Sequence, residues 1–158
     1  MKNTYDIPDY NKYLSLKVSP GLWLVLLYLL RPYLIVALSV VNPSDRMELI
    51  NMFYQDRLPM FLSATAAIPA ALLVFAWLKR LPGANDLVRA IWANGRLLLG
   101  FSALLNCITA YLPIYLGVTR KLDNLAWLQL GLSVLVIFYI LLCQRVKDTF
   151  ADFPEENK

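Results

Sequence analysis

The sequence predicts an all-α membrane protein with four transmembrane helices in a small bundle and short interfacial amphipathic helices. Four apolar stretches, at 22–41, 58–78, 97–118 and 125–143, cover about half of the 158 residues. Each approaches the ~20 residues that a helix rising ~1.5 Å per residue needs to cross ~30 Å of hydrocarbon. The chain is 59% hydrophobic and only 16% charged, and the stretches are apolar on all sides rather than along one stripe. These observations favour lipid contact over a water-soluble core.

The charged residues predict one membrane domain with both ends on the same side. We expect a tail over 1–18, a four-helix transmembrane domain over 19–143 and a second tail over 144–158. Ten Lys and Arg residues lie in the tails and in the loop between the second and third stretches, whereas the two opposite loops carry four. Since positive residues stay on the cytoplasmic side, both termini are predicted to be cytoplasmic. A cleaved signal peptide is disfavoured because the first apolar run is long and contains Arg31.

The first stretch begins with strong helix signals and carries one costly charge. Ser19 supplies an N-cap hydroxyl and Pro20 a first-turn proline. Thirteen Leu, Val and Ile side chains outweigh the ~2.5–3.5 kcal/mol that a central Arg31 costs, so this helix is expected to span. Pro32 cannot donate to the Tyr28 carbonyl, which leaves an acceptor one turn away. The next segment, 45–55, is predicted as an amphipathic surface helix; an ordinary loop is the alternative.

The second stretch is rich in small residues. Ser63, Ala67 and Ala71 recur at helical spacing, which lets another helix approach closely, and Pro69 predicts a bend. Asn85 or Asp86 is expected to cap a following interfacial helix through 92, broken by the Asn-Gly pair at 94–95.

The third and fourth stretches contain most of the polar side chains. The third places Ser102, Asn106, Thr109 and Pro113 along one face, and the fourth carries Gln129. Such side chains can line a polar pathway, or they can only form interhelical hydrogen bonds worth ~0.6 kcal/mol each.

Arg31 is the main candidate for a functional residue because a charge inside hydrocarbon is expensive. It can form an anion site, or face a wet cavity or a partner. It can equally be a structural lock that satisfies itself on the Tyr28 carbonyl, Asn106 or Gln129, and snorkelling is a third option. The candidate ligand- or partner-binding residues are therefore Arg31, Tyr28, Ser102, Asn106, Thr109 and Gln129.

Several chemistries lack the residues that they need. The chain contains no histidine, which removes the commonest metal ligand and general base. Cys107 and Cys143 do not form a close-spaced metal or redox pair. No Asp or Glu lies inside an apolar stretch to relay protons. We expect no catalytic residue, cofactor or metal, and no nucleic acid as a partner.

The leading functional hypothesis is a non-enzymatic assembly or interaction subunit that contacts the lipid bilayer and binds either itself or a larger membrane protein. The alternative is a small transporter or channel with an anion-accepting cavity around Arg31. A weaker third hypothesis is an enzyme acting on lipid head groups through interfacial charged residues, namely Asp56, Arg57, Asp86 and Asp123.

Three sequence elements carry a resemblance to a known family. They are GLWLVLLYLLRPYLIVALS at Gly21–Ser39, FYQDRLPMFLSATAAIPAALL at Phe53–Leu73 and WLKR at Trp77–Arg80. The chain resembles the YfeZ-like small inner-membrane proteins of gamma-proteobacteria from about Tyr13 to Lys147, most recognisably in its Arg-Pro-Tyr and Ile-Pro-Ala elements. The resemblance implies a multi-pass protein of the bacterial inner membrane without an established activity, and it carries over no site residues.

Overall fold

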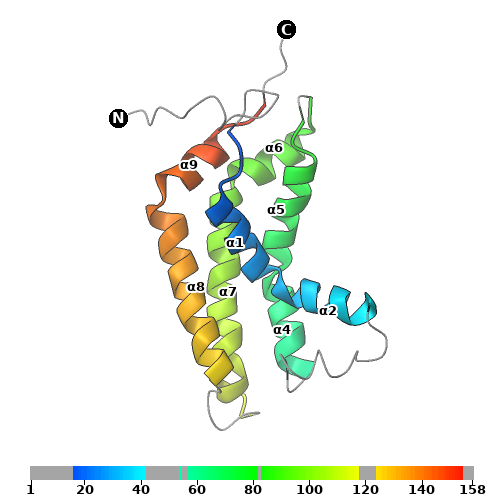
Figure 1. Cartoon of the computed structure of the whole chain (residues 1–158), viewed down its shortest axis with the longest axis vertical. Helices are drawn as coiled ribbons and strands as arrows, with labels where there is room; N and C mark the ends of the chain where they lie inside the picture. The colour runs from blue at the N-terminus through cyan, green and yellow to red at the C-terminus, as the bar shows by residue number, and fades with distance from the viewer. Residues whose placement is uncertain (1–15, 42–53, 55–56, 82, 118–123, 155–158) are drawn as a thin grey trace.

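In a computed structural model, which describes residues 16–41, 54, 57–81, 83–117 and 124–154, all the regular elements are helices. This confirms the all-α class (Figure 1). The helices are α1 Pro20–Leu29, α2 Arg31–Val41, α4 Arg57–Ala66, α5 Ile68–Leu78, α6 Asp86–Ala93, α7 Gly95–Tyr115, α8 Asn124–Leu142 and α9 Gln144–Ala151. The surface helix expected over 45–55 falls almost wholly outside the described residues.

Helix α7 is the centre of the molecule. It runs without interruption for 21 residues, about 31 Å at the usual rise, and packs against α8, α4 and α5 along its length (Figure 1). Its segment Gly95–Leu112 is long and apolar enough to cross a membrane. Within the described part of the chain, it is the one helix that meets this criterion alone.

The other apolar stretches form bent pairs rather than straight helices. Helices α1 and α2 meet at 69°, α4 and α5 at 42°, and α8 and α9 at 66°; counting each pair as one span gives up to four spans. The single helix expected over 22–41 is therefore replaced by two helices. Helix α2 leaves the bundle and runs across its long axis (Figure 1).

Two of these bends have a proline as their local cause. Pro32 in the first turn of α2 and Pro69 in the first turn of α5 cannot donate to the carbonyls of Tyr28 and Thr65, four residues earlier. The bend predicted at Pro69 is confirmed. The third bend has no proline. There Cys143 adopts an extended conformation between α8 and α9.

Side chains of α7 donate to carbonyls beside two of the bends. The Ser102 hydroxyl donates to the Ala66 carbonyl at the last residue of α4, over 2.7 Å. Arg96 donates through Nε to the Ile140 carbonyl at 2.9 Å and through Nη2 to the Leu141 carbonyl at 2.5 Å, in the last turn of α8. Helix-breaking residues are tolerated in membranes where neighbouring helices satisfy the freed backbone groups.

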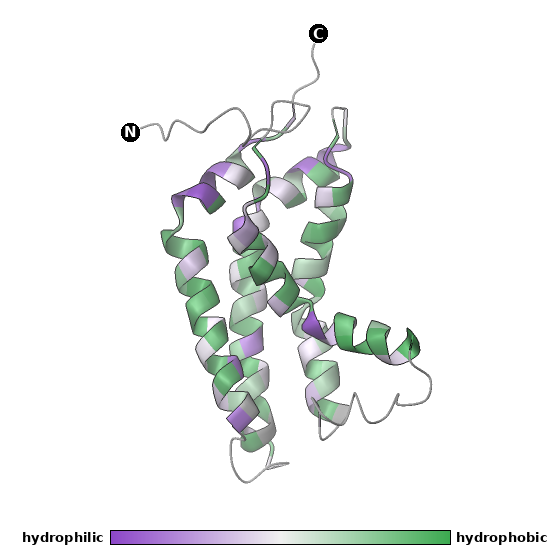
Figure 2. Cartoon of the chain, viewed as in Figure 1, coloured by the Kyte–Doolittle hydropathy of each residue, from purple (hydrophilic) through white to green (hydrophobic). Residues whose placement is uncertain are grey.

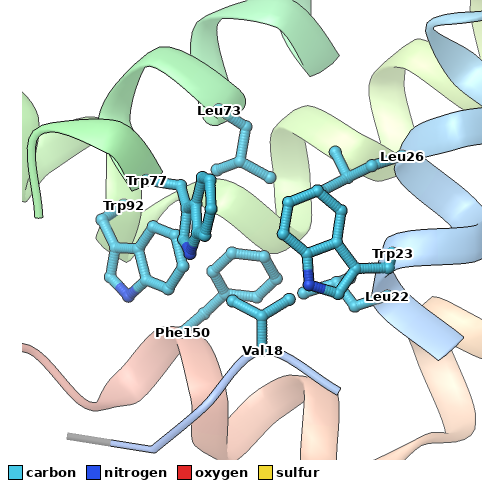
Figure 3. Close-up of a pocket in the computed structure, with 8 residues that line it drawn as sticks. All are labelled: Val18, Leu22, Trp23, Leu26, Leu73, Trp77, Trp92 and Phe150. Atoms are coloured by element: carbon cyan, nitrogen blue, oxygen red, sulfur yellow. The ribbon is translucent and has the colours of Figure 1, made fainter. Parts of the chain in front are cut away.

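The short helices α6 and α9 close one end of the bundle. Asn85 occupies the N-cap position of α6 without a side-chain capping hydrogen bond, and Asn94 separates α6 from α7, at the positions that the sequence predicted. Polar residues gather on α9 and around the start of α6 (Figure 2). Beneath them lies an apolar cluster that joins four segments (Figure 3), namely Val18, Leu22, Trp23, Leu26, Leu73, Trp77, Trp92 and Phe150. Its internal space of about 10 Å³ holds one water at most, so this cluster is core.

The two ends of the described chain meet at this closed end. The Leu16 backbone N–H donates to the Asp152 carboxylate at 2.5 Å. The start of α1 matches the predicted signals, because the Ser19 hydroxyl accepts from the Leu22 N–H and Pro20 occupies the first turn. Much of the expected second tail forms α9, which contacts α6 and α7.

The small residues of the second stretch are distributed over both halves of its bent pair. Ser63 and Ala67 are buried and Ala71 is half-buried. Ser63 also accepts a hydrogen bond from the Tyr54 hydroxyl at 3.1 Å. Helix α4 packs on α7 through this region.

Two glycines of α7 provide a matched test of how α9 docks. A Cβ at Gly95 would lie 2.4 Å from the Phe150 ring and 2.6 Å from Leu73, whereas a Cβ at Gly100 meets nothing within 4 Å. Because both neighbours of Gly95 are buried, Gly95→Ala should destabilise the protein by about 1–3 kcal/mol. Gly100→Ala should be neutral or stabilising by up to about 1 kcal/mol. Thermal unfolding in detergent measures both variants, and equal effects would contradict this packing of α9.

Candidate functional site

The break between α1 and α2 places Arg31 against two other helices. Its guanidinium carbon lies 4.8 Å from the centroid of the Tyr28 ring. Its Nη2 donates to Oδ1 of Asn106 on α7 at 3.4 Å. In the described part of the chain, no carboxylate forms an ion pair with Arg31. The break therefore places Arg31 beside α7, with no ion-pair partner among the described residues.

Asn106 is the hub of the polar contacts around Arg31. It is buried, and its Nδ2 donates to the Ser102 carbonyl at 3.2 Å. Gln129 of α8 donates to the Asn106 carbonyl at 3.2 Å and to its Oδ1 at 3.4 Å. The Thr109 hydroxyl also donates to that carbonyl, at 3.1 Å. Asn106 thus connects the break in the first stretch to α8.

Tyr28 makes the second connection between the break and α8. Its hydroxyl donates to the Gln129 carbonyl at 2.9 Å and lies 2.8 Å from the Ser133 hydroxyl. Ser133 is fully buried. These contacts hold the Tyr28 ring in position beneath the Arg31 guanidinium.

A cavity of about 210 Å³ opens beside Arg31. Its walls come from α1, α2, α8 and the residue Tyr54 that precedes α4. They are Tyr28, Arg31, Ile35, Tyr54, Leu128, Gln129 and Leu132. The lining therefore combines one cation and one amide with two tyrosines and three aliphatic side chains.

The contacts of Arg31 with the protein are weak. Its hydrogen bond of 3.4 Å is longer than the usual 2.7–3.2 Å, and interhelical bonds of this kind are worth ~0.6 kcal/mol. One cation–π contact adds about 0.5–2 kcal/mol. Among the described residues, these two contacts are the ones recorded for the guanidinium.

The structure brings most of the six candidate residues together. Tyr28, Arg31 and Gln129 line the cavity, and Asn106 contacts Arg31 from behind. Ser102 lies one turn away and is directed to α4, while Thr109 bonds within its own helix. Of the residues weighed for head-group chemistry, Asp86 is exposed in the first turn of α6. Asp56 and Asp123 lie outside the described residues, and no side-chain position is described for Arg57.

Sequence reasoning missed several residues of this site. Ile35, Leu128 and Leu132 read as ordinary lipid-facing residues, and Tyr54 lay in a predicted surface helix. Ser133 stands one turn after Gln129, at the i+4 spacing that places both on one face of α8. That spacing was the available signal.

A second polar cluster at the closed end was also missed. Arg80, whose side chain is 7% exposed, stacks on Trp92 at 4.4 Å. It donates to the carbonyls of Leu16 at 3.1 Å and Asp152 at 2.7 Å, and Trp92 Nε1 donates to the same Asp152 carbonyl. Burial lowers the pKa of Arg80, and the Asp152 carboxylate opposes that shift. This cluster holds the two ends of the described chain together.

A larger hollow near the turn from α5 to α6 has little chemistry to offer. Its volume is about 490 Å³, and Lys79 is the single charged side chain among its lining residues. Lys79 is exposed. The cavity beside Arg31 combines a cation with hydrogen-bonding groups and apolar walls, so we take it as the candidate site.

Comparison with known proteins gives a family but no activity. The model of a family described as "Protein of unknown function (DUF2919)" matches residues 5–152. Neither the curated proteins nor the solved structures contain a match.

Tyr28→Phe tests the contacts that position the site. Removing the hydroxyl leaves the buried Ser133 and the Gln129 carbonyl without this partner, which should cost about 1–2 kcal/mol of unfolding free energy. Tyr111→Phe is the matched control, since that ring on α7 is 54% exposed, and it should change stability little. Thermal unfolding of the two purified variants measures the difference. Equal stability of both variants would show that the Tyr28 hydroxyl does not hold the break.

Proposed function

The chain belongs to the DUF2919 family of proteins of unknown function, and from its own geometry we propose that it is a multi-pass protein of the bacterial inner membrane. In this proposal it is a non-enzymatic interaction subunit that assembles through α2. The kinship to YfeZ-like inner-membrane proteins of gamma-proteobacteria is part of the same proposal.

Exposed apolar side chains support the membrane location. Large hydrophobic residues on α1, α7 and α8 face outward, among them Leu24 at 68%, Leu97 at 72% and Leu135 at 64% exposure. Monomeric soluble proteins rarely expose contiguous apolar patches of more than a few hundred Å². The lengths of α7 and α8, 21 and 19 residues, give about 31 and 28 Å, close to the ~30 Å hydrocarbon thickness.

The positions of the chain ends support a cytoplasmic location for both. Four crossings, with each bent pair counted as one, return the chain to its starting side, and Leu16 contacts Asp152. Cationic residues of the same end include Lys17, Lys79 and Arg89. An excess of such residues marks the cytoplasmic side.

The course of α2 is the observation that carries the proposed assembly role. The helix leaves the bundle at the 69° bend and runs across it (Figure 1). Near its start, the Tyr33 hydroxyl anchors it to the Ala64 carbonyl at 2.8 Å. Beyond that point its aliphatic side chains are exposed, namely Leu34, Val36, Leu38, Val40 and Val41.

A second copy of the chain is the partner that best suits this helix. The exposed part of α2 carries no charge, so its partner must present an equally apolar surface, and another α2 does so. Symmetric association of identical chains is the commonest form of oligomer. We therefore assign the exposed face of α2 to self-association within the membrane.

Cysteine crosslinking in native membranes tests this assignment. In a chain with Cys107 and Cys143 replaced by Ala, Leu38→Cys on α2 should form an adduct of twice 18.0 kDa with a short bifunctional maleimide. Leu135→Cys on α8 is the control, because its exposure of 64% is close to the 61% of Leu38, and it should stay monomeric.

Three outcomes oppose the proposal, two from the crosslinking and one from a separate carbonate extraction. Equal adduct yields at the two positions, or monomer at Val36, Leu38 and Val40 alike, would remove α2 as the assembly surface. Loss of the chain from membranes on sodium carbonate extraction would refute integral insertion.

The cavity beside Arg31 favours a second candidate function, a small transporter or channel that accepts an anion. The Arg31 guanidinium supports it, because it lines a cavity of about 210 Å³ and has no ion-pair partner among the described residues. Charged residues within membrane segments commonly mark a substrate or ion pathway.

A further inference from the structure

We propose that the cavity beside Arg31 binds a long-chain carboxylate, with its head group on the guanidinium and its hydrocarbon between α2 and α8. The proposal rests on the second candidate function, since it names the ligand class of that anion-accepting cavity.

The guanidinium supplies the contact for the head group. Arginine has five N–H donors in a planar fork that matches a carboxylate. In the described structure Arg31 donates one hydrogen bond, to Asn106 at 3.4 Å. The other N–H groups of Arg31 have no partner among the described residues, and Arg31 lines the cavity. Arg31 also begins α2, whose positive helix end favours an anion.

The aliphatic walls select the rest of the ligand. Beside Arg31 and Gln129, the cavity is lined by two tyrosines, Tyr28 and Tyr54, and by three aliphatic side chains, Ile35, Leu128 and Leu132. A small inorganic anion would lose hydration against these walls and gain nothing in return. A hydrocarbon chain gains from the same contact, because apolar surface of both partners leaves water. The combination of one cation and aliphatic walls fits an anion that carries a hydrocarbon.

The size and the opening of the cavity indicate a single chain. Its volume of about 210 Å³ is below the ~300–1,000 Å³ of pockets that enclose drug-sized ligands. It therefore takes a carboxylate and the first part of one chain. The remaining chain can follow α8, where Leu128, Leu132 and Leu135 lie on one face and are all exposed.

Fluorescence titration with cis-parinaric acid, a fluorescent long-chain carboxylate, tests the proposal on the purified full-length protein in a nonionic detergent. The acid should bind saturably, and its methyl ester should bind at least about 10-fold more weakly because it lacks the charge. Arg31→Gln should weaken binding of the acid by a similar factor, and Arg31→Lys by less. Arg89→Gln is the control, since that arginine stacks on Phe153 and is not among the cavity residues.

A second variant decides the matter if Arg31→Gln does not fold. Leu132→Trp fills the cavity and leaves the arginine in place, so it should also abolish saturable binding. Equal binding by wild type and Leu132→Trp would overturn the proposal, as would equal binding of the acid and its ester.

Inorganic anions separate this proposal from the function on which it rests. Calorimetric titration with sodium phosphate and sodium chloride measures their binding to the same preparations. If either binds in an Arg31-dependent way and parinaric acid does not bind, the long-chain class is wrong and the anion cavity stands. If no anion binds, both the ligand class and the anion-accepting cavity fail.

Discussion

Interrupted helices in apolar surroundings need replacement partners for their backbone groups, and the polar side chains of α7 supply them. Two of the three bent pairs meet such a side chain: Arg96 donates to carbonyls in the last turn of α8, and Ser102 donates to the carbonyl at the end of α4. At the third bend the contact is between side chains, since Asn106 accepts from the Arg31 guanidinium. Unsatisfied backbone groups cost several kcal/mol in hydrocarbon. Without α7, the α4–α5 and α8–α9 bends would lack these partners, so this unbroken helix stabilises the two bent pairs beside it.

The candidate site is a direct consequence of one of these bends. A straight helix over 22–41 would leave Arg31 on the surface of a continuous rod. The 69° turn instead directs α2 away from α8 and leaves a cavity at the junction. Tyr28 and Asn106 then hold the arginine at its edge. The same turn exposes the aliphatic face of α2, so the cavity beside Arg31 and the proposed assembly surface share one origin.

Local signals in the sequence predicted much of this architecture, whereas contacts between distant segments escaped them. The start of α1, the bend at Pro69, the cap of α6 and the break before α7 follow from residues within one turn of each feature. The proximity of Arg31 to Tyr28 and Asn106 followed from the scarcity of polar partners in apolar stretches. The docking of α9 and the Arg80 cluster depend on hydrogen bonds to backbone carbonyls 60 or more residues away. Because every residue has a backbone carbonyl, such acceptors cannot be recognised from the sequence. The hydrogen bonds of Arg96 to α8 could not be predicted for the same reason, since their acceptors are also backbone carbonyls.

A double-mutant cycle between Ser102 and Pro69 tests the central claim most directly, because it asks whether α7 compensates for a broken neighbour. Ser102→Ala should cost about 1 kcal/mol of unfolding free energy in the natural chain. Pro69→Ala restores the donor to the Thr65 carbonyl and removes the cause of the bend, so that a continuous helix pairs the Ala66 carbonyl with the Ala70 N–H. The same serine change should then cost close to nothing. Such coupling is what a cycle isolates. An equal cost of Ser102→Ala in both backgrounds would contradict the account. It would show that the Ser102 hydrogen bond contributes to helix packing without compensating for the bend at Pro69.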